Sequence, residues 1–412
     1  MKKQNYLKIF LIFCCQFLHN IYCHEIILNV LVDQILLKND NSLFLFENVG
    51  KINDLYDLQF SNFFDVPLKA ILQYSAGNWF LNKKKLRIKT LQLSPHDSDK
   101  NYCLMYKNNQ YHGNMILFVQ DDKILIINQI PLEEYVKAVI AKEVFPGWNA
   151  EALKTIAIVI RTYALHLWEE AQKRNKIYHI TNTIKHQKYD GMQSHLSIDK
   201  AVLDTRGMVI VDKKKKKPIL AMYHVCCGGV IPIECVGFDF YNHPYLKRKK
   251  QCTGCQRYKF FHWKKQVNYM CFLNKLKEVC ADMTIIKVSK INKISYSKTG
   301  AVRRLCIEVE VKKNKKGSMK KNIILNNKSL RKIFNIKLSR YSSCFTIIYD
   351  EDFNFIIEGK GAGHHIGLCQ RGMYEYSKQG KICAEIIDFY YPYTEIINYV
   401  DIMEKNNEKN NI

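Results

Sequence analysis

The chain has 412 residues, of which 47% are hydrophobic and 12% aromatic, and its formal net charge is +25. This composition can build a hydrophobic core, so it excludes a mainly disordered chain, and the length exceeds that of one small domain. The positive charge fits an anionic partner: a nucleic acid, an anionic wall polymer or a membrane face.

The N-terminal segment has the pattern of an export signal. Three lysines within the first eight residues precede or enter the apolar run Ile9–Leu18. That run is shorter than the roughly 20 apolar residues that span a bilayer, so we expect residues 1–23 to be a signal peptide and the protein to be exported to the periplasm or cell envelope. An uncleaved segment that holds the protein at the membrane, or lipid attachment at Cys23, remains the alternative. Export argues against a nucleic-acid partner.

Residues 24–130 are predicted to be rich in β-structure, because short apolar runs alternate with turns. The predicted strands are Ile26–Val32, Ser42–Phe46, Leu86–Leu91, Met115–Val119 and Ile124–Ile127.

A helix pair is predicted after Pro131, where apolar residues begin to recur at helical spacing. The first helix runs to about Val144 and is broken by Pro146 and Gly147. Asn149 can cap the second helix, which is apolar on nearly every face and should be buried.

The rest of the chain returns to strands and ends in helices. Residues 174–200 form a polar connection, and strands with glycine-containing turns follow over residues 201–312. A strand at Phe355–Glu358 enters a glycine-rich loop, and helices are predicted from about Gln370 and Cys383. We therefore expect an α+β fold built on the buried helix pair, with a catalytic domain over residues 131–400 and a disordered tail over 401–412.

Glu143 is the first candidate for chemistry, because it continues the apolar stripe of the first predicted helix, away from Glu133 and Glu134. A buried carboxylate either pairs with a cation or takes a raised pKa and keeps its proton. The second outcome is what a general acid needs. Arg161, in the apolar second helix, is the candidate partner for a structural ion pair, so both interpretations remain open.

The glycine-rich loop over residues 359–367 is the second candidate site. It lacks the Lys-Ser/Thr ending of a phosphate-binding loop and the spacing of a dinucleotide site. Its glycines and His364 fit close approach to a flat, neutral ligand such as a sugar ring. A purely structural turn is the alternative.

The cysteines form the third candidate. Cys252 and Cys255 make a C-x-x-C pair, and the run from His224 to Gly229 contains Cys226 and Cys227. In an exported protein, cysteines usually form disulfides, yet this grouping also has the pattern of a structural zinc site. Zinc, disulfides and free thiols remain open.

Several segments, in this order along the chain, resemble the SpoIID/LytB family of lytic transglycosylases and amidase enhancers. The segments that carry the resemblance are Asn128–Tyr135, Ala141–Pro146, Trp148–Lys154, Arg161–Ala164, Gln187–Gly191, Thr205–Gly207, Gly228–Gly229, Gly363–His364 with Gly367 and Gln370, and Tyr390–Pro392.

The resemblance implies an enzyme that cleaves the MurNAc–GlcNAc linkage of peptide-stripped peptidoglycan strands and leaves 1,6-anhydro ends. Glu143 falls on the family's catalytic acid, and no cofactor is required for catalysis. The residues that would line the glycan groove are Arg161, Gln187, Tyr189, His364 and Gln370. The alternative is a wall-binding enhancer of an N-acetylmuramoyl-L-alanine amidase, and such an amidase is the expected protein partner.

Two further expectations come from comparison with the family pattern. Some relatives pair a Cys-Gly-Gly with a C-x-x-C, and by this resemblance the ligands of a structural zinc would be Cys227, Cys252, Cys255 and His224. In the usual Gly-His-Gly-x-Gly-x-Ser-Gln loop, this chain has His365 for a glycine and Cys369 for the serine. Because glycine tolerates backbone angles that histidine avoids, we expect a reshaped loop at His365.

Overall fold

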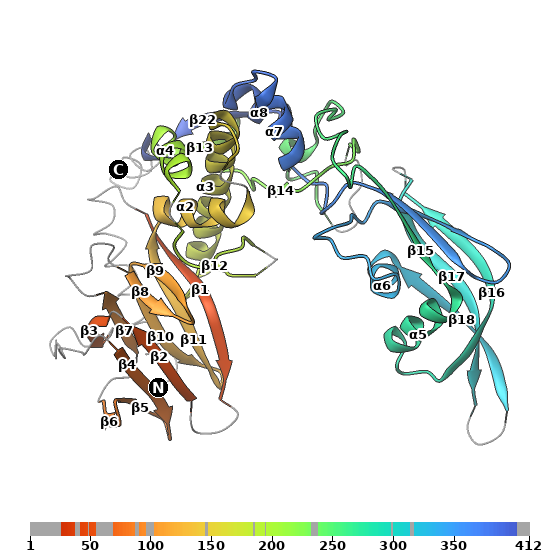
Figure 1. Ribbon diagram of the computed structural model, residues 1–412, viewed down its shortest axis with the longest axis horizontal. Coiled ribbons are helices and arrows are strands. Elements are labelled where there is room, and N and C mark those ends of the chain that lie inside the picture. The colour runs from red at the N-terminus through yellow and green to blue at the C-terminus, as the bar shows by residue number, and fades with distance from the viewer. Residues whose placement is uncertain are drawn as a thin grey trace. The chain divides into compact units, whose positions relative to one another are not determined.

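The computed structural model describes residues 26–401 except 38–41, 48, 55–68, 87–89, 96–102, 145–146, 184–185, 194, 232–237, 298–299 and 314–316. The predicted signal peptide, and the predicted tail from residue 402 onward, lie outside the described residues. The chain forms two compact units, Met1–Leu220 with Ile396–Ile412, and Ala221–Glu395. Strands and helices occur in both units, which confirms the α+β class (Figure 1).

The first unit begins with two sheets. Their strands are β1 (Ile27–Leu36), β2 (Ser42–Glu47), β3 (Val49–Asp54), β4 (Lys69–Ser75), β5 (Asn78–Leu81), β6 (Lys84–Lys85), β7 (Leu91–Pro95), β8 (Cys103–Tyr106), β9 (Asn109–His112), β10 (Asn114–Gln120), β11 (Lys123–Pro131) and β12 (Ile180–Thr181). One sheet has the order β12-β1-β11-β10-β7-β3, and the other β6-β5-β4-β2-β8-β9.

The burial pattern of the strands follows their place in the sheets. β11 pairs on both sides and is buried along almost its whole length, as expected for a central strand. β2 alternates instead, with Phe44 and Phe46 buried and Leu43 and Leu45 exposed. Four of the five predicted strands are confirmed. The centre of the fifth, residues 87–89, lies outside the described residues, and β7 begins at its last residue, Leu91.

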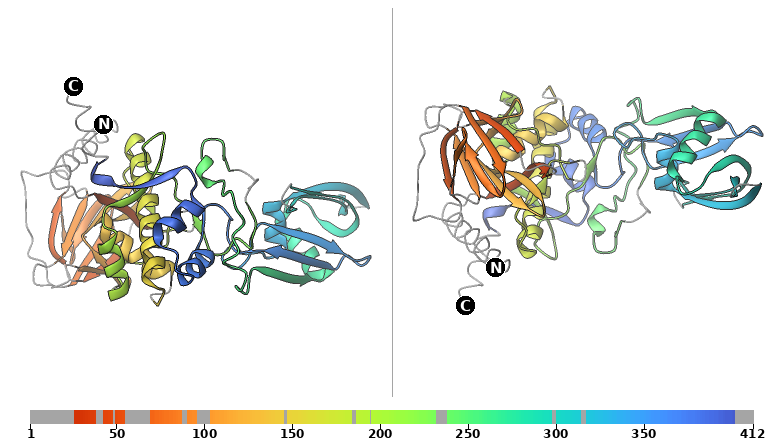
Figure 2. Two further views of the ribbon diagram at one scale, coloured as in Figure 1. Left: turned by 90° about the horizontal axis from the view of Figure 1, so that it is seen from above. Right: turned by 90° about the horizontal axis from the view of Figure 1, so that it is seen from below.

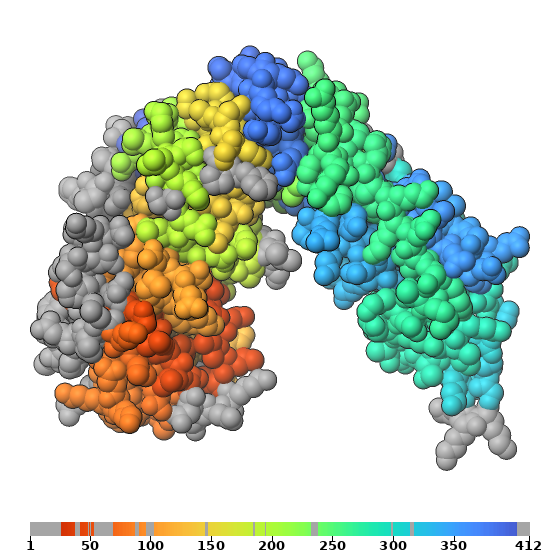
Figure 3. Space-filling model, viewed as in Figure 1, coloured from red at the N-terminus to blue at the C-terminus, as the bar shows by residue number. Residues whose placement is uncertain are grey.

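The predicted helix pair is confirmed as α2 (Leu132–Glu143) and α3 (Ala150–Lys173). The side chain of Asn149 caps α3 by accepting a hydrogen bond from the amide of Ala152 at 3.0 Å. α3 is buried on most faces because it packs against α2, against α4 (Leu196–Asp204) and against β13 (Met208–Asp212). Figure 2 shows the pair beside the sheet strands, and Figure 3 shows α4 packed against it.

The structure divides the chain differently from the sequence-based boundary at residue 130. β11 runs across that position and leads directly into α2, and the amide of Leu132 donates to the carbonyl of Ile26 at 2.9 Å. The sheets and the helix pair therefore belong to one unit. The chain returns to this unit at its end, where β22 (Thr394–Asn398) pairs with β13.

The second unit contains two three-stranded sheets, β15-β20-β19 and β16-β17-β18, and the parallel pair β14-β21. Its elements are β14 (Tyr223–His224), a 3-10 turn (Pro244–Leu246), β15 (His262–Val267), α5 (Tyr269–Val279), β16 (Ile285–Tyr296), β17 (Val302–Lys312), β18 (Ser318–Asn326), α6 (Asn327–Ile333), β19 (Phe345–Tyr349), β20 (Phe355–Lys360), β21 (Leu368–Cys369), α7 (Gln370–Lys378) and α8 (Cys383–Tyr390).

Helix α5 is absent from the sequence-based expectation of strands over 201–312. It packs through Phe272, whose ring lies 4.4 Å from that of Phe355 and 5.6 Å from that of Phe334. Asn268 caps it by accepting from the amide of Cys271 at 2.8 Å. This cap, followed by apolar residues at helical spacing, is a sequence signal that could have found it. Among the helices described here, none is both long enough and apolar enough to cross a membrane.

The titration of His179 should make the stability of the first unit depend on pH. Its Nδ1 lies 2.9 Å from the amide of Asn29, from which it accepts a hydrogen bond, and burial lowers its pKa to about 3. In the unfolded chain its pKa is about 6.5, so between these values the unfolded state binds a proton that the folded state excludes. The free energy of unfolding should therefore fall by about 2 kcal/mol between pH 7 and pH 5 from this group alone.

Urea unfolding at the two pH values measures this effect. His179→Gln keeps a hydrogen-bond acceptor but cannot titrate, so the difference between pH 7 and pH 5 should shrink by about that amount. An unchanged difference in the variant would contradict the assignment.

Candidate functional site

Glu143 lies at the C-terminal end of α2 and is half-buried. Its Oε1 accepts a hydrogen bond of 3.2 Å from the backbone amide of Lys188. The carboxylate thus lies at the edge of the core and not within it. A group in this position has a fixed direction and can still be reached by a ligand.

The segment 187–191 runs beside this carboxylate and is held by buried tyrosines. The hydroxyl of Tyr135, on α2, donates to Oε1 of Gln187 at 3.1 Å. The hydroxyl of Tyr189 donates to Oδ1 of Asn128, on β11, at 2.5 Å. The two tyrosine rings also pack against each other, with their centroids 5.3 Å apart. The segment is therefore fixed to the strand and the helix that lead up to Glu143.

The protonation of Tyr135 suits this role. Burial raises its pKa well above the ordinary value, and the nearby Tyr163 and Glu143 raise it further. Tyr135 therefore keeps its proton at neutral pH and remains the donor of its hydrogen bond to Gln187.

Asp190 and Gly191 complete the segment. The Asp190 carboxylate lies 3.7 Å from Nζ of Lys142 and 3.2 Å from Nζ of Lys188. Lys142 directly precedes Glu143 in the chain, and Lys188 is the residue whose amide donates to Glu143. Gly191 has φ +78°, and a Cβ atom there would lie 2.1 Å from the carbonyl oxygen of Gln110. Only glycine fits at this turn.

Arg161 is fully buried and its partner is Glu133, which corrects two expectations. Nε and Nη2 of Arg161 donate to the two carboxylate oxygens of Glu133 at 2.8 and 2.7 Å, and Nη1 donates to the carbonyl of Met208 at 3.2 Å. Glu133 is therefore turned inward and does not lie on the solvent side of α2. The guanidinium joins α2, α3 and β13 and does not form the ion pair with Glu143 that the sequence left open.

Three residues of the expected glycan groove are below the surface. Arg161, Gln187 and Tyr189 are each no more than 1% exposed. In this structure they do not present their side chains to a ligand, because their polar atoms bind neighbouring protein groups. Arg161 binds Glu133 on α2, and Gln187 and Tyr189 tie the segment 187–191 to α2 and β11.

His364 and Gln370, the other two expected groove residues, belong to the second unit. His364 is half-buried, its Nδ1 accepts from the amide of Ile366 at 3.1 Å, and burial lowers its pKa to about 4. Gln370 is the first residue of α7, and its buried Nε2 has no hydrogen-bond partner in the described part of the chain.

His365, for which we expected a reshaped loop, adopts a backbone conformation that is unusual for histidine. Its φ of +67° lies in the left-handed region that glycine normally occupies. The ring of His365 is buried, which lowers its pKa to about 4.

Four buried cysteine sulfurs gather in the second unit, from Cys227, Cys252, Cys255 and Cys369, all within 4.8 Å of one another. The Sγ of Cys255 lies 3.6 Å from that of Cys227 and 4.0 Å from that of Cys252. Three of these residues were expected as metal ligands.

The fourth member of this cysteine cluster is Cys369, and the expected His224 is not part of it. Nδ1 of His224 lies 3.1 Å from the carbonyl oxygen of Ile366, so this ring nitrogen is engaged by the backbone. The signal for Cys369 was present in the sequence, where it replaces the usual serine directly before Gln370.

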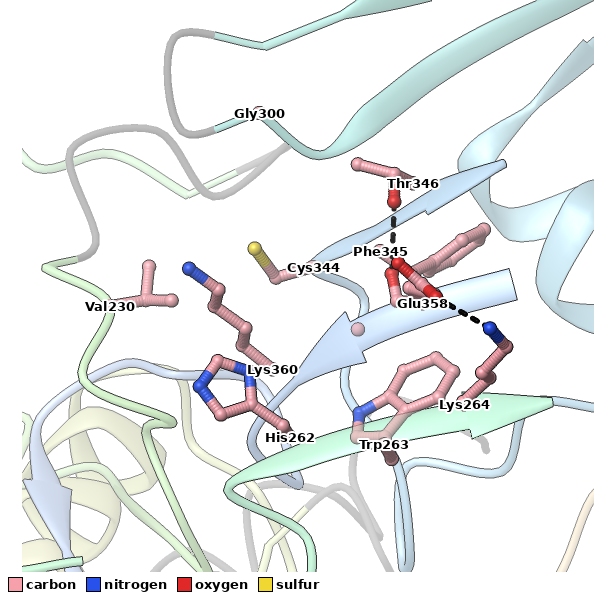
Figure 4. Close-up of a pocket in the computed structure, with 11 residues that line it drawn as sticks. Val230, His262, Trp263, Lys264, Gly300, Cys344, Phe345, Thr346, Glu358 and Lys360 are labelled. Atoms are coloured by element: carbon pink, nitrogen blue, oxygen red, sulfur yellow. Dashed lines mark hydrogen bonds and ion pairs between the residues drawn. The ribbon is translucent and has the colours of Figure 1, made fainter. Parts of the chain in front are cut away.

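A separate cavity of about 570 Å³ opens on the sheet of β15, β19 and β20 in the second unit. Figure 4 shows His262, Lys360 and Cys344 around it, with Trp263 below and the 3.1 Å ion pair of Lys264 and Glu358 at one side. Its volume is in the range of ligand pockets, and no sequence motif predicted it.

Comparison with known proteins identifies the family. The family model SpoIID, described as Stage II sporulation protein, matches residues 120–211. An uncharacterized protein of Brachyspira hyodysenteriae is 31% identical over 295 residues, which cover 70% of this chain and 73% of that protein. Stage II sporulation protein D of Bacillus subtilis is 24% identical over 285 residues, 66% of this chain and 75% of its own length. The chain belongs to the SpoIID family.

A second Bacillus subtilis relative, named amidase enhancer, is 24% identical over 369 residues, 80% of this chain. The match spans half the length of that protein. The SpoIID match over residues 120–211 contains α2, α3 and the segment 187–191, so it covers Glu143 together with the groups that fix it.

The Arg161–Glu133 pair yields a prediction for the stability of the first unit. Arg161→Met leaves the Glu133 carboxylate largely buried without its cation, so the free energy of unfolding should fall by about 3 kcal/mol. The matched control is Lys154→Met on the same helix, whose ion pair with Glu151 is more exposed and should contribute less than about 1 kcal/mol. Urea unfolding compares the two. Equal losses would contradict a structural role for the buried pair.

Proposed function

We propose that this SpoIID-family protein is a peptidoglycan lytic transglycosylase with Glu143 as its general acid. The observation that carries the proposal is the position of Glu143: a partly accessible carboxylate, fixed by the amide of Lys188, within the region that matches the family model. The names of two relatives, stage II sporulation protein D and amidase enhancer, support a role at the cell wall.

The proposed reaction needs one carboxyl group. Glu143 donates its proton to the glycosidic oxygen between MurNAc and GlcNAc, and the bond from C1 of MurNAc to that oxygen breaks. The C6 hydroxyl oxygen of the same MurNAc then bonds to C1 and gives its proton to the Glu143 carboxylate, which restores the acid. The products are a 1,6-anhydro end and a free GlcNAc hydroxyl, and no water is consumed.

The surroundings of Glu143 fit the deprotonated state that it reaches after it has donated its proton. When the carboxylate has lost its proton, the amide of Lys188 donates to it, and the cations held by Asp190 lie nearby. Because the carboxylate is anchored through residues 187–191, its direction is set before the glycan binds, which reduces the entropy cost of reaching the reactive geometry.

Several wider proposals follow from this function. Catalysis uses no cofactor, and the substrate is a glycan strand already stripped of stem peptides. An exported protein in the periplasm or cell envelope, with an amidase as partner, is consistent with such a substrate. The net charge of +25 then serves attraction to anionic wall polymers or to the membrane, not to nucleic acid.

Glu143→Gln tests the mechanism. The amide keeps the shape of the side chain but has no acidic proton, so cleavage of peptide-free glycan strands should fall at least about 100-fold, while strand binding persists. Mass spectrometry of 1,6-anhydro-ended fragments measures cleavage, and co-sedimentation with the strands measures binding. Glu134→Gln, on the same helix and paired with Lys137 at 2.7 Å, is the control and should remain active. A Glu143→Gln variant with control-level activity would exclude Glu143 as the acid.

The second candidate function is enhancement of an amidase without glycan cleavage, and the 80% coverage by the amidase enhancer match favours it. The two functions differ in their dependence on Glu143. If the protein cuts strands, any stimulation of an N-acetylmuramoyl-L-alanine amidase that depends on cutting should disappear in Glu143→Gln. Equal stimulation by both forms, with no anhydro ends produced, would identify an enhancer.

A further inference from the structure

We propose that Cys227, Cys252, Cys255 and Cys369 together bind one structural Zn²⁺ ion. The four sulfurs have the spacing that a single tetrahedral ion requires. With zinc–sulfur bonds of about 2.3 Å, the sulfurs at the corners of a tetrahedron lie about 3.8 Å apart. The observed separations from Cys255 are 3.6 and 4.0 Å, and no pair in the cluster exceeds 4.8 Å.

The chemistry of the ligands limits which ions can bind. Four thiolates favour zinc or iron over the hard cations that bind carboxylates. An iron–sulfur cluster would hold its cysteine sulfurs further apart than this cluster does, because sulfide and several irons would stand between them. Zinc, which prefers a closed tetrahedral sulfur site, fits the space.

Neighbouring groups are placed to support thiolates. The amides of Cys227 and Gly372 each lie 3.3 Å from Sγ of Cys369, to which they donate. The hydroxyl of Tyr390 lies 3.1 Å from Sγ of Cys252, and the buried guanidinium of Arg248 lies 5.7 Å from the ring of Tyr390. Four thiolates around Zn²⁺ carry a net charge of −2, so these donors and this buried cation stabilise the complex.

The site would join parts of the second unit that are distant in sequence. Cys227 follows β14, Cys252 and Cys255 lie in a loop, and Cys369 ends β21 and caps α7. A Cβ atom on Gly372 would lie 2.4 Å from Sγ of Cys252, so glycine is needed for α7 to approach the cluster. Without an ion, holding these segments together means closing the loop of more than 100 residues between Cys255 and Cys369 at an entropy cost.

The ion would therefore fix the start of α7. Cys369 is directly followed by Gln370, a residue that the family resemblance places at the glycan groove, so the metal would set the position of Gln370 without touching substrate. All four cysteines are buried, and the four ligands complete the coordination of zinc, which is typical of a structural site. This inference is independent of the reaction proposed for Glu143.

Metal analysis of the full-length protein, purified without chelators, tests the inference. One zinc per chain and no iron is the expected result. Cys369→Ser should reduce the bound zinc at least fivefold, whereas Cys271→Ser, at an exposed site on α5, should keep it. His224→Asn distinguishes the four-cysteine cluster from the ligand set expected from the sequence, which contained His224. This variant should also keep the metal. Loss of zinc in His224→Asn with retention in Cys369→Ser would overturn the assignment.

A second measurement uses the unaltered protein, because a cysteine variant can fail to fold. Alkylation followed by peptide mapping, with and without removal of zinc by a chelator, identifies the protected thiols. We expect chelation to increase labelling of Cys227, Cys252, Cys255 and Cys369, and to lower the melting temperature. Purified protein that contains no zinc and carries disulfides at these positions, or a labelling pattern that does not change on chelation, would refute the site.

Discussion

The buried ion pair between Arg161 and Glu133 is the interaction on which the arrangement around Glu143 depends. A guanidinium without solvent contact must have its charge and its donors satisfied, and Glu133 does so with both carboxylate oxygens. The pair fixes the rotation of α2 about its axis, because it ties the first turn of that helix to α3. Glu143, ten residues later on the same rigid helix, then points in a direction set by this contact.

The segment 187–191 provides a hydrogen-bond donor to Glu143, which lies outside the segment. Three of its five residues have contacts that hold it in place: Gln187 with Tyr135, Tyr189 with Asn128, and Gly191 close against the carbonyl of Gln110. The result is that the amide of Lys188 lies beside Glu143. Gln187 and Tyr189, which we expected to contact the ligand, are buried and hold the segment in place. The group that reaches Glu143 is the backbone N–H of Lys188.

In the second unit, long loops must be held in place. Most of the described residues between β14 and β15, and between β20 and α7, lie outside sheets and helices, so few regular backbone hydrogen bonds fix them. Buried thiols of four residues, a tyrosine hydroxyl and close glycine contacts gather at the start of α7 instead. His365 fits into this loop with a glycine-like φ of +67°, which shows that local packing can hold a conformation that histidine rarely adopts.

The α+β class, the helix pair, the cap at Asn149, the strands β1, β10 and β11, and the place of Glu143 at the end of its helix could all be predicted from the sequence. These features depend on local periodicity and on residues close in the chain. Three outcomes could be seen only in the folded chain: Glu133 pairs with Arg161, Gln187 and Tyr189 are buried, and Cys369 completes the cluster where His224 was expected. These outcomes depend on contacts between residues 28 to 142 positions apart, whose geometry no local pattern encodes.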